Sequence, residues 1–428
     1  MQIPEHVLHF IWRFRLFRQF GLVCRNGERV EVVHPGNYNT DAGPDFLFAH
    51  LRINGQDWYG HIEIHVQSSD WELHGHDKNK SYNAVILHVV WEGDRDCYLE
   101  DGALLMSLGM KDLVEKSVLN KIDRLLQNNH WLPCSYGLNN VAEYQKIHVL
   151  NRMGIERLEA RYETILGLLK LYRGDWERVC LSLMAGAFGM KVNRQVFMDL
   201  SEILSLKLIQ KMKGNSKTVQ AIFFGQAGFL KSYRGEDPYL LKLVDRYSYL
   251  QRIHSLNEIS GFQWKFMRMR PFNFPTLKLA QLAAMYCKFS SWFSLVVGAL
   301  SLDELKECLR ELEVPEFWET HFHFEKETSS HSTAITEQSF HLLAINSFIP
   351  LLFAYGKYVG DQNYMDGAIS WLESLKAENN SVSRRYKRYG LTLCNALETQ
   401  AVLHMRSTYC DPKLCLECGI ALAIIKRD

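Results

Sequence analysis

The feature that most constrains the fold of this chain is a hairpin signal, Asn54-Gly55, within the stretch from residue 36 to residue 67. Asn-Gly favours the tight two-residue turn that joins antiparallel strands. Alternate residues of a strand point to opposite faces of a sheet. The strand after this turn therefore carries an apolar face and a polar face, and the polar face presents His61, Glu63, His65 and Gln67.

Two carboxylates flank this hairpin. Asp45 follows Gly43-Pro44, where the chain enters the first strand, and Glu63 lies on the second strand. Carboxylates on adjacent strands can share a hard cation such as Mg²⁺ or Mn²⁺. We expect Asp45 and Glu63 to bind the metal, His65 to orient water or contact a phosphate, and Gln67 to add a hydrogen bond.

The register of the hairpin sets a condition on that site. A two-residue loop pairs Leu51 with Trp58 and Leu47 with Ile62, and strict alternation then puts Asp45 on the apolar face. Asp45 reaches Glu63 only if the chain twists at Gly43-Pro44 or if Gly60 marks a bulge.

Pro44-Asp45 and Glu63-Ile64-His65 resemble the motif of the PD-(D/E)xK nuclease superfamily. The resemblance implies a restriction-endonuclease-like α/β domain, metal-dependent cleavage of phosphodiesters and a helix acid at the metal, for which Glu5 is the candidate. Glu5 at a helix start also complements the helix dipole. His65 stands where the motif has lysine, and Lys78 or Lys80 would supply the missing charge. The alternative is an amphipathic hairpin with a polar outer face.

Length and composition set the remaining bounds. A chain of 428 residues is expected to form two or three domains. Its net charge of +1 excludes an overall basic footprint, so nucleic acid would be held by local patches. Ten cysteines without a secretory signal favour a reducing, cytoplasmic location. The longest apolar stretch, residues 342–355, is too short to span a membrane.

Periodicity divides the chain into two parts. Residues 4–20 are expected to form a helix, and residues 29–34 and 84–92 strands, the latter central. We predict an α+β protein. A small nuclease-like α/β domain is expected over residues 1–110, and a mainly helical region, of one or two subdomains, over residues 111–428. The predicted helices cover 111–127, 143–172, 175–188, 193–213, 216–230, 238–255, 276–288, 302–312, 336–356, 362–376 and 382–407, with a loop at 325–335.

Several stretches resemble a bacterial family of unknown function, domain of unknown function 2851. They are IWRFRLF, NYNTDAGPDF, GHIEIHVQSSDW, YNAVILHVVWE, EDPYL, RMRPFNFP and YCDPKLCLEC. The resemblance covers nearly the whole chain and implies no particular activity.

Three thiols near the C-terminus, Cys410, Cys415 and Cys418, have a spacing found in metal sites. Zinc, an iron–sulfur cluster and three simple thiols all remain open, with His404 or Cys394 as the candidate fourth ligand. His74, His76 and Asp77 are a second candidate metal locus, although a polar surface loop is favoured there.

Two basic clusters could hold a nucleic-acid backbone or form ordinary solvated helix faces. They are Lys265, Arg268 and Arg270, and Arg384, Arg385, Lys387 and Arg388, the second set with Tyr386 and Tyr389 as partners for bases. The chain has no phosphate-binding Gly-rich loop, no Gly-x-Ser-x-Gly elbow and no His-Glu-x-x-His helix, which disfavours those enzyme classes.

The leading hypothesis is a metal-dependent nuclease or a nuclease-derived nucleic-acid-binding protein. The alternative is a non-catalytic scaffold that binds a protein partner through its helical region. A zinc hydrolase using His61, Glu63 and His65 ranks last, because alternate strand residues lie about 6.6–6.8 Å apart and the two histidines would be too distant for one ion. The sequence does not determine the oligomeric state.

Overall fold

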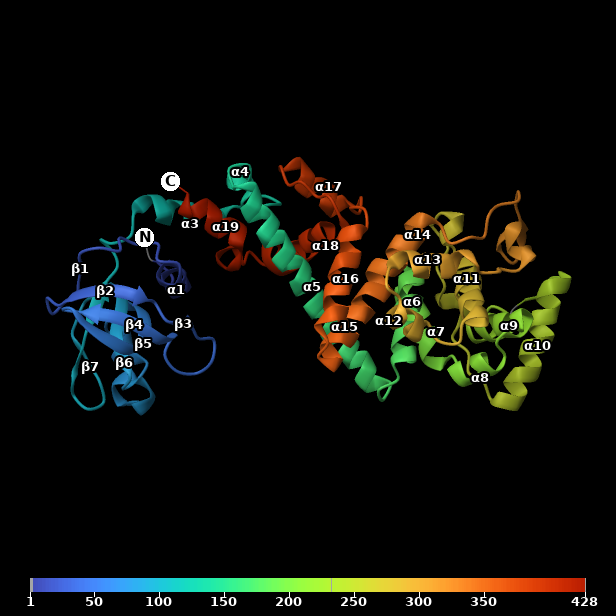
Figure 1. Ribbon diagram of the computed structural model, residues 1–428, viewed down its shortest axis with the longest axis horizontal. Coiled ribbons are helices and arrows are strands. Elements are labelled where there is room, and N and C mark those ends of the chain that lie inside the picture. The colour runs from blue at the N-terminus through green and yellow to red at the C-terminus, as the bar shows by residue number, and fades with distance from the viewer. Residues whose placement is uncertain (1–2, 232, 428) are drawn as a thin grey trace. The chain divides into compact units, whose positions relative to one another are not determined.

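A computed structural model describes residues 3–231 and 233–427 of the chain, which form two compact units. The first unit contains Met1–Val149, Arg388–Leu391 and Met405–Asp428, and the second contains Leu150–Lys387 and Thr392–His404. The sequence of the second unit is thus inserted into that of the first. Helix α5 (Glu143–Leu171) carries the chain from one to the other (Figure 1).

A mixed sheet dominates the N-terminal part of the first unit, and in the described residues its order is β1-β2-β4-β5-β6-β9, with β3 also paired to β4. Pairs from β1 to β5 are antiparallel, whereas β5, β6 and β9 run parallel. The predicted strand at 84–92 is β6, and its central position is confirmed. The strands are β1 (Leu22–Val23), β2 (Arg29–His34), β3 (Asn37–Tyr38), β4 (Phe46–Ile53), β5 (Gln56–Gln67), β6 (Val85–Glu92) and β9 (Ser107–Gly109), with β7 (Cys97–Tyr98) and β8 (Leu104–Leu105) forming a separate pair.

The β4–β5 hairpin turns at Asn54-Gly55 as predicted, but its register shifts along its length. Leu51 pairs with Trp58, whereas Ile62 pairs with Phe46 and not with Leu47. The cause is a bulge between Phe46 and Ala49, where Phe48 takes a left-handed φ of 58°. The predicted pairing of Leu47 was therefore wrong, whereas the irregularity expected at Gly60 is present: the extra residue lies in β4, next to the Ala49–Gly60 pair.

Helix α1 (Glu5–Arg13) is shorter than the predicted helix over 4–20. Arg15 has a φ of 53°, and the Leu16 N–H donates to the Ile11 carbonyl at 2.9 Å. This left-handed closing turn is a common way to end a helix. Between β5 and β6 the chain crosses over through α2 (Asp70–Leu73) and two 3₁₀ turns, η1 (His76–Lys78) and η2 (Lys80–Tyr82).

The first unit is completed by helical segments from both ends of the chain. They are α3 (Lys116–Gln127), α4 (Ser135–Leu138), the π-turn η7 (Arg406–Cys410), the 3₁₀ turn η8 (Cys415–Glu417) and α19 (Gly419–Lys426). Helices α3 and α19 lie side by side (Figure 1).

The second unit is mainly helical, which confirms the predicted helical character of the remainder of the chain. Its largest buried aromatic side chains include Trp292, Trp318 and Phe348. Its helices are α6 (Trp176–Gly189), α7 (Arg194–Ile203), α8 (Leu206–Lys211), α9 (Ser216–Gln226), α10 (Pro238–His254), α11 (Pro275–Lys288), α12 (Trp292–Gly298), α13 (Leu302–Arg310), α14 (Glu337–Leu343), α15 (Ile349–Val359), α16 (Gln362–Ser374), α17 (Ser381–Arg388) and α18 (Ala396–Met405).

Several predicted boundaries differ from these helices. The helix predicted over 193–213 is interrupted at Leu204, and α12 and α19 were not predicted. Strand β11 (Lys326–Glu327), inside the predicted loop, pairs with β10 (His321–His323). The segment Glu337–Val359 is long and apolar enough to cross a membrane, but 67% of its apolar window is buried inside the protein, as in the core helix of a soluble protein.

Candidate metal centre

Asp45 and Glu63 lie together at the end of the hairpin, where the bulge in β4 reverses the alternation of faces. The Asp45 N–H donates to Glu63 Oε2 at 3.1 Å, and the Ile64 N–H donates to Asp45 Oδ2 at 2.9 Å. Glu63 is only 5% exposed. Reciprocal hydrogen bonds between backbone and carboxylate therefore fix both acids on one strand pair.

Three histidines surround this acid pair. The nitrogens of His65, His74 and His76 lie within 4.8 Å of one another. His76 Nε2 is 3.2 Å from Glu63 Oε1, and His65 Nε2 is 3.8 Å from the same oxygen. The two-turn crossover after β5 thus brings His74 and His76 back over the strand that carries Glu63 and His65.

Behind His65 lies a fourth imidazole. His88, on β6, is fully buried, and its Nε2 is 2.8 Å from His65 Nδ1, while His65 Nε2 is 3.1 Å from His74 Nδ1. Burial, reinforced by the neighbouring histidines, lowers the pKa of His65 to about 2 and that of His88 to about 3. Both rings are therefore neutral at pH 7, which is the form in which histidine binds metals.

Two carboxyl groups of the site, those of Glu63 and Glu5, have raised pKa values instead. Burial raises the pKa of Glu63, and the charge of Asp45 raises it further, against the hydrogen bond from His76. Burial likewise raises the pKa of Glu5, with a further contribution from Asp45. Burial and the charges of Glu63 and Asp45 raise the pKa of Tyr82 to about 12. A cation placed among these groups would lower the cost of ionising the two carboxylates.

Helix α1 adds two groups to the rim of the site. His9 Nε2 is 3.4 Å from Asp45 Oδ2. Burial lowers the pKa of His9, but its contact with Asp45 and the charges of Asp45 and Glu5 outweigh this, so that the pKa is raised overall. Glu5, predicted as a secondary metal ligand, thus lies on the helix that faces the acid pair.

The residues present fit a bound metal ion. Three imidazole nitrogens and the Glu63 carboxylate form a compact set of donors, and His65 is oriented by His88 from behind, as ligating histidines commonly are. Imidazole donors suit Zn²⁺ or Fe²⁺ best, and of the harder ions Mn²⁺ accepts them more readily than Mg²⁺, which prefers oxygen ligands.

Exposed aromatic side chains continue along the same hairpin face. The aromatic track, as we call Phe48, His50, Tyr59 and His61, leads from the acid pair toward the turn. The His50 and Tyr59 rings stack 4.3 Å apart, and the Phe48 and His61 rings meet edge to face at 5.7 Å. Phe48 is 71% exposed and Tyr59 73% exposed. Such exposed rings offer stacking surfaces for bases.

Other predicted members of the site lie away from the acid pair. Gln67 is exposed, and its N–H donates to Asp70 Oδ2 at 3.0 Å. His61 Nδ1 accepts the Phe48 N–H at 3.2 Å and lies outside the histidine cluster. The three histidines that lie together are His65, His74 and His76, and not the predicted set of His61, Glu63 and His65. Lys78 is 86% exposed and lies near Asp77, and Lys80 is also exposed, so neither substitutes for the motif lysine.

Sequence reasoning missed His9 and His88, and it treated His74 and His76 as a separate locus. His76 is buried and stacks on Tyr82 at 3.8 Å, contrary to the expected polar surface loop. One signal was available: His9 lies one helical turn after Glu5, on the same face of α1. His88 gave no signal, because it lies within a continuously apolar strand.

The predicted C-terminal cluster and basic patches lie elsewhere. Cys415 and Cys418 are buried and Cys410 is half-buried, all in the first unit. Cys394 is exposed in the second unit, where His404 Nε2 lies 3.5 Å from Glu156 Oε2. The basic residues are exposed, but Tyr386 is fully buried and Tyr389 stacks on Trp131, which removes both as free partners for bases. The exposed set is Lys265, Arg268, Arg270, Arg384, Arg385, Lys387 and Arg388.

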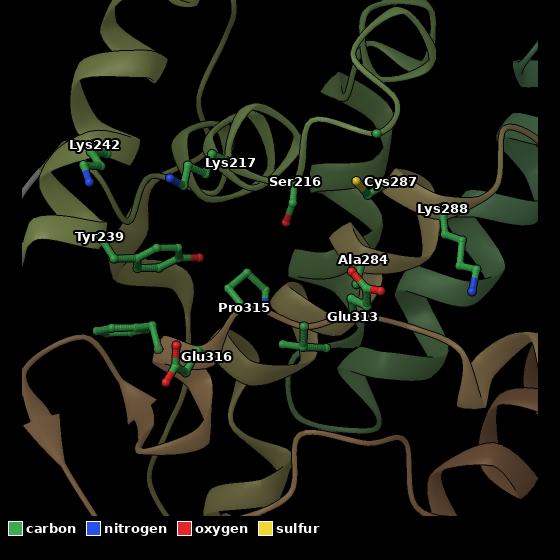
Figure 2. A pocket seen from close by; sticks show the side chains of 13 residues that line it. Ser216, Lys217, Tyr239, Lys242, Ala284, Cys287, Lys288, Glu313, Pro315 and Glu316 are labelled. Atoms are coloured by element: carbon green, nitrogen blue, oxygen red, sulfur yellow. The ribbon is translucent and has the colours of Figure 1, made fainter.

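The second unit has a hollow of its own, about 690 Å³ in volume. Lys217, Lys242 and Tyr239 line one side, and Cys287 and Lys288 line the other (Figure 2). Lys288 is engaged by Glu311, to whose carbonyl and carboxylate it donates at 2.8 Å. Val314 and Pro315 line it too, as do Glu313 and Glu316, so the lining combines apolar residues with charges of both signs.

Comparison with known proteins gives one match. The model of a family described as "Protein of unknown function (DUF2851)" matches residues 5–381. No curated protein and no solved structure matches the chain significantly.

Proposed function

Because the chain belongs to the DUF2851 family, whose function is unknown, we propose its activity from the site itself: it is a metal-dependent hydrolase that cleaves phosphodiester bonds in nucleic acid. The observation that carries this proposal is the placement of Asp45 and Glu63 against His65, His74 and His76. The buried Glu63, whose pKa burial raises, and the neutral imidazole of His65 together form a site that favours a divalent cation.

In this proposal Glu63, His65, His74 and His76 hold the metal, and Asp45 either binds it directly or binds its water. A divalent ion in such a site supplies an activated water and stabilises charge on the departing oxygen. Of the two metals expected from the sequence, the three imidazoles favour Mn²⁺ over Mg²⁺. His65, being neutral, is a ligand here and not a substitute for the lysine of the PD-(D/E)xK motif, whose fold and chemistry the proposal shares.

His9 is suited to proton transfer at this site. It lies 3.4 Å from Asp45 Oδ2, and against the effect of burial this contact and the charges of Asp45 and Glu5 raise its pKa. Imidazole is the side chain most often used for proton transfer in catalysis. Arg13, one turn further along α1, lies 5.3 Å from the ring of Tyr38, which is 41% exposed. A phosphate at the metal would thus have a guanidinium and an aromatic ring at the rim of the site.

The substrate class follows from the aromatic track. Phe48 and Tyr59 expose their rings on the hairpin face that carries Glu63. Each stacked base contributes about 1–3 kcal/mol in proteins that bind single strands. We therefore propose single-stranded DNA or RNA as substrate, with the protein acting in the cytoplasm.

The test combines metal binding with cleavage. Mn²⁺ should raise the melting temperature of the full chain, and the Mn²⁺-loaded protein should cleave labelled single-stranded DNA or RNA. Asp45→Asn and Glu63→Gln should each lose cleavage, whereas Glu72→Gln, at an exposed acid of the same unit, should retain it. Absence of both a Mn²⁺ shift and cleavage in the unmodified protein would reject the proposal.

Substitution of His65 separates its two conceivable roles. As a metal ligand it cannot be replaced by lysine, whose ammonium has no lone pair, so His65→Lys should lose Mn²⁺ binding and activity together. Unchanged or increased cleavage by His65→Lys would instead assign the residue to the phosphate.

A second candidate function rests on the hollow in Figure 2. Lys217 and Lys242 on one side of it suit acidic residues of a partner's peptide, and its apolar lining suits apolar ones, while Glu313 and Glu316 lie elsewhere in the lining; such a peptide site is in keeping with a scaffold role. Lys217→Glu with Lys242→Glu should then abolish partner binding and leave Mn²⁺ binding intact. A protein that binds neither metal nor nucleic acid, but loses a partner in this double variant, would favour the scaffold.

A further inference from the structure

The first unit contains a second cluster of metal-binding side chains, made from segments at opposite ends of the sequence. Cys134 immediately precedes α4, while Cys410, Cys415 and Cys418 belong to the segment before α19. Cys134, Cys415 and Cys418 are buried, and Cys410 is half-buried. The sequence had indicated only the last three.

Packing of helices fixes one side of this arrangement. Gly137 of α4 faces Ile424 of α19 so closely that a Cβ on the glycine would lie 2.9 Å from the isoleucine Cγ2. A larger residue at position 137 would force the Ile424 side chain to shift. The start of α4, and with it Cys134, is therefore held against the helix that follows Cys418.

Polar contacts fix the other side. The Arg406 guanidinium lies 4.4 Å from the centre of the Trp131 ring and donates to the Trp131 carbonyl. Lys413 Nζ donates to Asn129 Oδ1 at 2.6 Å. The segment just before Cys134 is thus joined at two points to the segment that carries the other three cysteines.

Within that segment, tight turns bring the thiols back toward one another. The Cys418 N–H donates to the Cys415 carbonyl at 3.1 Å, which closes a 3₁₀ turn over the Cys-x-x-Cys pair. The Lys413 N–H donates to the Cys410 carbonyl at 3.3 Å, with Lys413 at a left-handed φ of 59°. Turns of this kind let a short segment present several thiols to one point.

The thiols also interact electrostatically. Burial raises the pKa of Cys134 well above its usual range, and the thiolates of Cys418, Cys410 and Cys415 raise it further. Burial and Cys418 likewise raise the pKa of Cys415 to about 11. Each C-terminal thiol therefore lies near enough to Cys134 to affect it electrostatically.

We propose that Cys134, Cys410, Cys415 and Cys418 are the four ligands of a structural centre for a thiophilic metal, either zinc or an iron–sulfur cluster. Four thiolates select these metals over Mg²⁺ or Ca²⁺. Binding would replace the four thiol protons with metal–sulfur bonds. Because the second unit is inserted between Cys134 and Cys410, the centre closes a long loop and holds together the two chain segments of the first unit.

The experiment measures the metal content of the full chain purified anaerobically without chelator. We expect about one zinc per chain, or the iron and sulfide of one cluster, which absorbs visible light and thus distinguishes the two. Cys134→Ser should lose this metal, whereas Cys24→Ser, at another buried cysteine of the same unit, should keep it. Glu63→Gln should also keep it, which separates this centre from the histidine site.

Titration of the unmodified protein covers the case in which Cys134→Ser does not fold. A mercurial that reacts with thiols should release the metal in proportion to the modification of four cysteines, and Cys415→Ser provides a second variant. Metal-free protein, or full metal retention in folded Cys134→Ser, would overturn the proposal.

Discussion

Asp45 and Glu63 are held to each other through the backbone. The N–H of Asp45 donates to Glu63 Oε2 at 3.1 Å, and Asp45 Oδ2 accepts the N–H of the residue after Glu63 at 2.9 Å. These contacts fix two acids side by side, although their mutual repulsion adds to the effect of burial in raising the pKa of Glu63. Hydrogen bonds of the sheet backbone thus set the positions of both carboxylates.

Replacing Glu63 tests how its ionised carboxylate affects stability and Mn²⁺ binding. The pKa of Glu63 is raised on folding, so its ionised form destabilises the folded protein above the unfolded pKa of about 4.3. Glu63→Gln removes the charge and keeps an acceptor for the Asp45 N–H. At pH 7 without Mn²⁺ we expect equal or higher stability, and with Mn²⁺ the loss of the stabilisation, about 2.7 kcal/mol at a hundredfold excess over Kd. Thermal melts with and without Mn²⁺ measure both effects; a variant that still shifts with Mn²⁺ would exclude Glu63 as a ligand.

The buried imidazoles predict a pH dependence. The pKa values of His65 and His88 are depressed to about 2 and about 3, so the unfolded chain binds more protons than the folded one below pH 6.5. Stability should therefore fall as the pH drops from about 6.5, by at most about 1.4 kcal/mol per pH unit for each histidine. Hydrogen-exchange protection of β5 and β6, corrected for intrinsic exchange rates, measures this. His88→Phe should make the slope shallower, and an equal slope in the variant would contradict the assignment.

The loop histidines should control affinity for the metal. His76→Gln removes an imidazole 3.2 Å from Glu63 Oε1, and His74→Ala removes another from the same cluster. Each should weaken Mn²⁺ binding at least about tenfold, as even outer-shell partners of a metal do when they are replaced. Isothermal titration calorimetry gives the Kd, with His6→Ala, at an exposed histidine of α1, as the control. Unchanged affinity in both variants would place the metal elsewhere.

The effect of the bulge in the backbone should be separable from the effect of the Phe48 side chain. Phe48 has a φ of 58° and is 71% exposed, so Phe48→Gly relieves backbone strain while exposing little new surface. We expect stability to stay equal or rise by about 1 kcal/mol, Mn²⁺ binding to persist, and affinity for single-stranded nucleic acid to fall. Deletion of Phe48 removes the bulge, turns Asp45 to the opposite face and should abolish Mn²⁺ binding. A folded deletion variant that still binds Mn²⁺ would show that the bulge does not place Asp45.

The local signals in the sequence were sufficient for much of the fold. Asn54-Gly55 determined the hairpin turn, and the continuous apolar run at 84–92 determined a central strand, because turn conformation and strand burial depend on neighbouring residues. Alternation along β5 put Glu63 and His65 on the face opposite Ile62 and Ile64, and in the structure all four are buried. The change to helical periodicity after the sheet could likewise be recognised in the sequence. These are properties of short segments, and the sequence encodes them directly.

Only the tertiary structure decided which of those residues meet. Phe48 lies in the bulge that lets Asp45 face Glu63, and the sequence marked only the opposite strand there, at Gly60. His9, His76 and His88 reach the site from a helix, a crossover and a neighbouring strand, and Cys134 reaches the C-terminal thiols across the inserted second unit. Such contacts join residues far apart in the chain, so they depend on how the elements pack and not on any pattern within one of them.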